Sequence, residues 1–315
     1  MGEVVDWLMN GPAYVKYRTM VDILKERDES SLLSAKDTML RDPLIQELLY
    51  EVKGWPWEPL AKHNDAKHPL HKLVFLSELG KMDALEEVLV SILSNVSDEG
   101  PPQIYTKLYK RWMGRDGEEY LWILCDAPLL LYALALQGYS DDTRMRKGVD
   151  FLASQVRENG WRCIASRELG NFRGPGPKES ICPYSTLLMM RLLATQERYL
   201  DSKPARLGAE SLLQRWEYKG REKPFLFGVG SDFKKLKSPL IWYDILHVTD
   251  VLSHFPFVRR DERFEEMVNI VRSKNINGRY TPESIWMAWK QWDFGQKKEP
   301  SYWLTFMVQR MLNRI

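Results

Sequence analysis

The sequence predicts an all-α protein, an (α/α)6 toroid with six inner helices and an outer helical layer, in a single domain over residues 1–315. Three observations predict it. Six prolines recur at intervals of 55 to 61 residues, each ahead of a strongly apolar run. More polar, amphipathic segments lie between these runs, and no convincing alternating β pattern is found. Each helix pair needs neighbours to bury its apolar face, so six similar pairs favour a closed ring over an open superhelix.

We expect an inner helix to begin at each of these prolines. Proline suits the first position of a helix, because the N–H that it lacks would have no partner there. Runs such as PLLLYALAL are apolar on most faces, which indicates a buried layer. The six positions are Pro12, Pro69, Pro128, Pro183, Pro239 and Pro300.

The outer layer is expected in the amphipathic segments at about 30–42, 82–96, 142–157, 204–217 and 261–274. Asn-Gly pairs at 159–160 and 277–278 follow two of them, as is typical of helix ends. The outer layer is incomplete after Pro300, and either Val4–Met9 or the segment 282–292 is expected to complete it.

Composition excludes several classes of partner. The 45 basic and 43 acidic side chains give a net charge of +2, so no overall charge predicts binding to nucleic acid or to an anionic membrane. No run reaches the roughly 18 apolar residues of a membrane helix, and the N-terminus lacks a signal-peptide core. Three cysteines in a chain of this length argue against a disulfide scaffold, so we expect a reducing, cytoplasmic location.

One segment resembles the QW repeat of squalene–hopene cyclases and related triterpene cyclases. It is RKGVDFLASQVRENGW at 146–161, although its leucine-to-glutamine spacing is one residue short. The resemblance implies the toroid shared by terpenoid cyclases and protein prenyltransferase β-subunits. It does not imply cyclase chemistry, because the sequence contains neither a DxDD acid motif nor a DDxxD motif.

In such a toroid the six inner helices begin at one mouth, where their N-terminal ends favour an anionic group. We therefore expect a central pocket for a small molecule, an isoprenoid or another apolar compound with an anionic group. The predicted ligand-binding residues are Tyr184, Trp242, Tyr243, Trp303, His71, Arg173, Lys178, Lys237 and Lys298. Tryptophans 286, 289 and 292 either form an aromatic wall or pack against the ring.

The cysteines form a candidate zinc site with ligands Cys125, Cys163, Cys182 and His247. All three cysteines are expected near the same mouth, and thiolates with imidazole are a zinc ligand set. Prenyltransferases bind zinc with Asp, Cys and His, and lanthionine-forming cyclases do so with two Cys and a His on a similar toroid. The alternative is that these cysteines only pack in the core.

The candidate catalytic residues are His247, Asp244 and Asp126. Asp244 precedes His247 by three residues on the same helix face, which would let it orient the imidazole. His63, His68 and His71 form a second cluster, for metal or base chemistry or for capping a loop. Three functions stay open: a hydrophobic-ligand enzyme or binder, a zinc-dependent enzyme, and a HEAT-like interaction scaffold.

Overall fold

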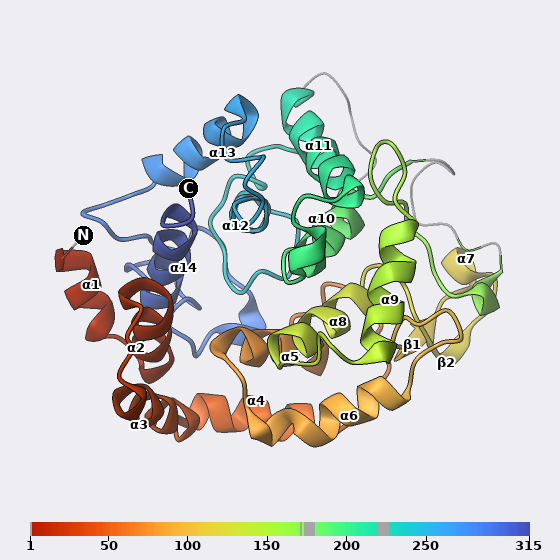
Figure 1. Cartoon of the computed structure of the whole chain (residues 1–315), viewed down its shortest axis with the longest axis horizontal. Coiled ribbons are helices and arrows are strands. Elements are labelled where there is room, and N and C mark those ends of the chain that lie inside the picture. Colours follow the sequence, from red (N-terminus) through yellow and green to blue (C-terminus); the bar gives the residue numbers. More distant parts are fainter. Residues whose placement is uncertain (1, 171, 173–179, 220–226) are drawn as a thin grey trace.

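The computed structural model describes residues 2–170, 172, 180–219 and 227–315. This part of the chain is mostly helical and carries one small two-stranded sheet (Figure 1). The prediction of a helical protein is therefore confirmed at this coarse level. In the same residues no helix has the length and apolar character needed to cross a membrane.

The six apolar runs each contain a helix. Proline occupies the first turn of α5, α8 and α10, as predicted, and every residue of α10 is buried. A π-helical turn, Met20–Leu24, continues the first of the six. Their bounds are α2 (Ala13–Thr19), α5 (Pro69–Leu79), α8 (Ala127–Leu136), α10 (Pro183–Leu193), α12 (Ile245–Leu252) and α14 (Tyr302–Leu312).

The prediction that Pro239 begins an inner helix is wrong. Helix α12 begins six residues later, where the Asp244 carboxylate caps it by accepting a hydrogen bond from the His247 N–H at 2.9 Å. The residues between are not helical, because side chains of α10 take up their carbonyls. Arg191 donates to the Leu240 carbonyl at 3.0 Å, and the Tyr184 hydroxyl donates to the Ile241 carbonyl at 2.7 Å.

The remaining long helices lie toward the periphery (Figure 1). All five predicted outer segments are helical, and α1 forms where Val4–Met9 was expected. The sequence did not predict α4, and the alternative segment at 282–292 holds only a 3₁₀ turn, Met287–Trp289. The bounds are α1 (Gly2–Met9), α3 (Glu29–Leu40), α4 (Pro43–Lys53), α6 (Glu86–Ser94), α9 (Thr143–Ser154), α11 (Lys203–Glu217) and α13 (Glu262–Ser273).

A short hairpin corrects the expectation of no β structure. Strands β1 (Ile104–Leu108) and β2 (Gly117–Leu121) pair antiparallel, with Ile104 opposite Leu121. The short helix α7 (Lys110–Met113) lies between them. Burial alternates along β1, but a five-residue strand gives too short a pattern to stand out in the sequence.

The six proline-associated helices are neighbours in chain order. Helix α5 contacts α8, α8 contacts α10, α10 contacts α12, and α12 contacts α14. Helix α14 in turn contacts α2, and α1 contacts both (Figure 1). The ring of Tyr14 on α2 lies 6.4 Å from that of Phe75 on α5. Helices from the two ends of the described chain therefore pack together.

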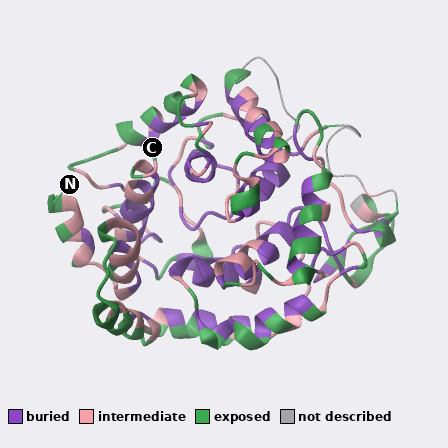
Figure 2. Cartoon of the chain, in the orientation of Figure 1, coloured by how far each residue is buried: buried purple, intermediate pink, exposed green. Residues whose placement is uncertain are grey.

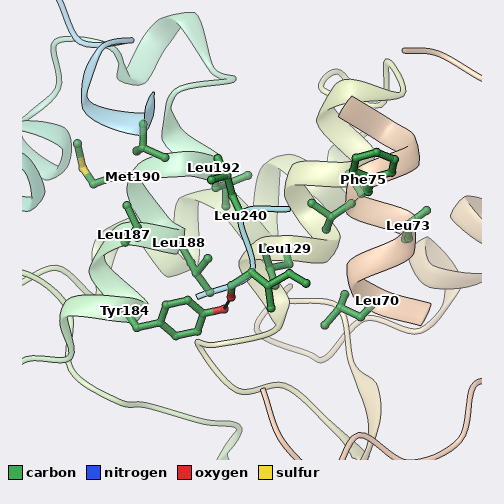
Figure 3. Close-up of a cluster of buried hydrophobic side chains, with 14 of the residues drawn as sticks. Leu70, Leu73, Phe75, Leu129, Tyr184, Leu187, Leu188, Met190, Leu192 and Leu240 are labelled. Atoms are coloured by element: carbon green, nitrogen blue, oxygen red, sulfur yellow. Dashed lines mark hydrogen bonds between the residues drawn. The ribbon is translucent and has the colours of Figure 1, made fainter. Parts of the chain in front are cut away.

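Buried side chains concentrate on these helices (Figure 2). Figure 3 shows leucines of α5, α8 and α10 in one buried cluster that also includes Leu240 of the segment before α12. A second group of rings surrounds Phe75, including Trp289 at 5.0 Å, Trp292 at 4.9 Å and Trp303 at 5.2 Å. Trp289 and Trp292 are buried, so of the two interpretations of these tryptophans, packing describes them.

Candidate metal centre

The three cysteines meet at one place in the structure. The Sγ atoms of Cys125, Cys163 and Cys182 all lie within 4.8 Å of one another. Cys125 lies just before α8, and Cys182 is the N-cap of α10. Cys163 lies in the loop between α9 and α10, so three separate segments contribute the sulfur atoms.

Two backbone bridges bring Cys163 to the other two sulfurs. Ile123 pairs with Ala165, which ties the loop to the segment before α8. Arg162 pairs with Ile181, which ties the same loop to the segment before α10. Each cysteine therefore lies within two residues of a bridge, and the sequence expectation that all three approach one end of the inner helices is confirmed.

The surroundings of Cys182 favour its thiolate. The Ser185 N–H, in the first turn of α10, donates to the Cys182 Sγ at 3.4 Å. Hydrogen bonds from the thiols of Cys125 and Cys163 hold the pKa of Cys182 well below its ordinary value. The Ser185 hydroxyl also lies 3.4 Å from the Cys125 Sγ. These contacts therefore stabilise the thiolate of Cys182 without a bound metal.

The donor set fits a thiophilic metal ion such as zinc. Two thiolates that bind one zinc at about 2.3 Å each are at most about 4.6 Å apart. Sulfurs within 4.8 Å of one another therefore need only a small movement to share one ion. Cys125 and Cys182 are buried, whereas Cys163 is half-buried and forms the side nearest solvent.

A histidine–aspartate pair lies beside the sulfurs. His63 Nδ1 is 2.9 and 3.0 Å from the two carboxylate oxygens of Asp126, the residue that follows Cys125. Burial alone would lower the pKa of His63, but the Asp126 carboxylate outweighs it and raises that pKa above its ordinary value. Negative charge on Cys182 acts in the same direction, so the imidazole lies within electrostatic range of this sulfur.

Sequence reasoning predicted Asp126 as a catalytic residue but did not name its partner. The available signal was the Cys125-Asp126 pair together with the histidine cluster at 63, 68 and 71. Their distance of about 60 residues in the chain hides the pairing from any local pattern.

The other two histidines of that cluster hold the loop in place. His68 caps α5, because its Nδ1 accepts from the Leu70 N–H at 3.2 Å and its Nε2–H donates to the Glu58 carbonyl at 3.0 Å. His71 Nε2–H donates to the His63 carbonyl at 2.8 Å, and burial lowers the pKa of His71 to about 4. His71 was predicted to bind ligand, and the structure places it as a support for His63.

The predicted metal ligand His247 is not part of the cysteine group within the described residues. Its Nδ1–H donates to the Trp242 carbonyl at 2.8 Å, and burial lowers its pKa to about 3. Asp244 accepts from the His247 main-chain N–H and not from its imidazole. Capping of α12 thus occupies Asp244, and the expected orientation of the His247 ring by Asp244 is not formed.

The predicted aromatic residues separate into two places. Tyr184, Trp242 and Tyr243 lie together, with ring centroids of Tyr184 and Trp242 4.5 Å apart. Phe227 joins them, at 5.0 Å from Trp242 and 5.7 Å from Tyr243. Trp303 belongs instead to the buried group around Phe75.

The predicted basic residues do not gather into one site in the described chain. The Lys237 ammonium lies 3.3 Å from the centroid of the Trp286 ring, and burial lowers its pKa. Lys298 is exposed. Arg173 and Lys178 lie outside the described residues.

Two cavities lie away from the cysteines. One of about 350 Å³ is lined by the C-terminal halves of α8, α10 and α12, including Arg191, Asp250 and His254. The other, of about 760 Å³, is lined by surface residues that include Arg146 and Arg198. Neither is lined by a predicted ligand-binding residue.

Comparison of the chain with protein-family models and with curated proteins found no match. The resemblance to terpenoid cyclases and prenyltransferases therefore stays a prediction.

Proposed function

We propose that the chain is a zinc-binding protein whose metal is held by Cys125, Cys163 and Cys182. One observation carries the proposal: the only three cysteines among 315 residues have their sulfurs within 4.8 Å of one another. Cysteine thiolates select soft and borderline metals, and zinc is the most common redox-inert ion in such sites. A disulfide would join two of these sulfurs and leave the third without a role.

We also propose that the inner helices close into a single α/α toroid around this site. The contact of α14 with α2 and the Tyr14–Phe75 ring pair support closure. An open, HEAT-like scaffold separates its first and last repeats. The metal would then lie at the N-terminal side of α8 and α10, between two repeat units.

A second candidate function adds an apolar ligand to the same site. Trp242 is half-buried and packs on Tyr184, whose phenol is within electrostatic range of Cys125. These rings would bind the apolar part of a small molecule, such as an isoprenoid, while its polar end approaches the cysteines. The first candidate does not depend on this one.

Metal analysis of the purified, untagged protein tests the first candidate. We expect about one zinc per chain in the wild type and loss of most zinc in Cys125→Ser and Cys182→Ser. The matched control is Val149→Ala, which truncates a buried side chain on α9 and should retain zinc. Circular dichroism reports whether each variant is folded.

Two results would contradict this proposal. One is a wild-type protein without zinc even after refolding in its presence. The other is an intact mass lower by two hydrogens under native conditions, which would identify a disulfide in place of a metal centre.

A further inference from the structure

The cysteine group offers three ligands, whereas zinc takes four. In the part of the chain that the structure describes, no histidine, aspartate or glutamate lies within 4.8 Å of all three sulfurs. Zinc sites with four protein ligands are structural, and sites with three keep one exchangeable position. The described residues therefore supply the number of donors that is typical of a site with an exchangeable position.

His63 is tied to the cysteine group through Asp126, the residue that follows Cys125 in the chain. In its neutral form, the imidazole donates its Nδ1–H to Asp126 and carries its lone pair on Nε2. No hydrogen bond to this Nε2 is formed within the described residues. The side chain of His63 is 32% exposed while that of Asp126 is fully buried, so the pair reaches from the core toward solvent.

The main chain keeps His63 in this place. His71 holds the His63 carbonyl at 2.8 Å, and His71 itself is buried on α5. Asp126 is held at the first turn of α8, next to Cys125. Both supports belong to rigid helices, and the half-buried Cys163 leaves access from outside.

We propose that the centre keeps its fourth coordination position open to an external molecule, and that His63, oriented by Asp126, accepts a hydrogen bond from that molecule. This inference rests on the proposed zinc site. It makes the centre a binding site for a ligand, whereas a structural centre would be closed.

Charge selects the class of ligand. Three thiolates against one divalent ion leave a net charge of −1, so a neutral donor is favoured over an anion. The lone pair of His63 Nε2 requires that this donor carry a hydrogen. The expected ligand is therefore a small neutral donor with an N–H, O–H or S–H group, and imidazole is a suitable probe.

Cobalt substitution tests this directly, because the visible absorption of Co²⁺ reports its ligands. We expect the Co²⁺-loaded wild type to show a saturable spectral change on titration with imidazole. His63→Ala should bind Co²⁺ as tightly as the wild type but bind imidazole about two- to tenfold more weakly, the loss of one hydrogen bond. Asp126→Asn should shift imidazole affinity in the same direction.

The matched control is His254→Ala, at the opposite ends of the inner helices, which should leave both titrations unchanged. If imidazole leaves the spectrum of the Co²⁺-loaded wild type unchanged and His63→Ala binds Co²⁺ more weakly, His63 is the fourth ligand and the inference is overturned. Equal imidazole affinity in the wild type and His63→Ala would remove His63 from the site. Failure of the wild type to bind Co²⁺ or Zn²⁺ would instead refute the proposed function.

Discussion

Buried polar groups have different partners at the two ends of the proline-associated helices. At the C-terminal ends, ions are paired within the protein: Arg191 with Glu78 at 2.6 Å and Arg314 with Asp250 at 2.8 Å. At the N-terminal ends of α8 and α10, the sulfurs of three cysteines lie within 4.8 Å of one another, and His63 lies against the Asp126 carboxylate that follows Cys125. One end pairs buried charges within the protein, and the other is the place where we propose that a metal cation binds.

At the ion-paired end, the Glu78–Arg191 pair has further contacts. Tyr132 donates to the Glu78 carboxylate at 3.0 Å, and the Arg191 guanidinium lies 4.6 Å from the centroid of the Tyr132 ring. Three helices, α5, α8 and α10, are joined by these contacts. This end therefore stabilises the fold, whereas we propose a functional role for the cysteine end.

The largest predicted effect is on the ion-paired end. Glu78→Ala should lower the free energy of unfolding by about 3–5 kcal/mol, because Arg191 would stay buried without its counter-ion. Zinc content should not change in the fraction that folds. Urea denaturation at neutral pH, combined with metal analysis, measures both.

The matched control for Glu78 is Glu119→Ala, which breaks an exposed pair with Arg115 and should cost at most about 1 kcal/mol. Equal destabilisation by the two variants would show that the Glu78 pair contributes no more than a surface pair. Loss of zinc from folded Glu78→Ala would show that the two ends are not independent.

The second predicted effect is on the pH dependence of stability, and its sign is opposite for Asp244 and Asp250, near the two ends of α12. Burial raises the pKa of Asp244 to about 7, so its contribution to stability is present below the unfolded pKa of about 3.9 and is lost as pH rises through 7. For Asp250, burial alone would raise the pKa, but Arg314 and Arg310 lower it. Its contribution is present above about pH 4 and lost as pH falls.

We therefore expect Asp244→Asn to be more stable than the wild type at pH 8, by about 2–4 kcal/mol from about 1.36 kcal/mol per pKa unit, and nearly equal at pH 4. Asparagine still caps α12, so the helix start is retained. Asp250→Asn should instead be less stable than the wild type at pH 8. Thermal unfolding across this pH range checks both, and a flat difference for Asp244→Asn would contradict a buried, titrating carboxyl.

The success of prediction from the sequence also differs between regions of the molecule. Proline spacing and apolar runs located the six proline-associated helices, because burial of a whole helix leaves a strong composition signal. The same signal misplaced the start of α12, because hydrogen bonds from the side chains of Arg191 and Tyr184 determine the backbone conformation after Pro239. The hairpin at 104–121 and helix α4 carried no signal of that strength.

For the site, helix order was enough to bring the three cysteines together. It also placed His247 with them, but within the described residues the group contains the three cysteines alone. Only the folded chain shows that the His247 Nδ1–H donates to the Trp242 carbonyl and that His63 pairs with Asp126. The Glu78–Arg191 pair was not predicted at all. Its residues are 113 positions apart and look like ordinary surface charges in the sequence.

The smallest predicted effect tests the second candidate function at the cysteine end. Trp242→Ala should weaken binding of an apolar aromatic probe several-fold, because one aromatic contact contributes about 0.5–1.5 kcal/mol. Zinc content should stay the same. Fluorescence titration measures the affinity, and Trp7→Ala, whose ring stacks on Tyr302 at the α1–α14 contact, is the matched control. Unchanged affinity would place Trp242 in ordinary packing.

The two backbone bridges beside Cys163 have a consequence for folding kinetics. The site joins segments 38 and 57 residues from Cys125, so it forms only after two repeat units have docked and their loop has ordered. Contacts made late in folding slow unfolding more than they speed folding. A metal bound there would crosslink neighbouring repeats and slow unfolding. Removal of the metal by a chelator would therefore shorten the lifetime of the native state and leave the folding rate almost unchanged.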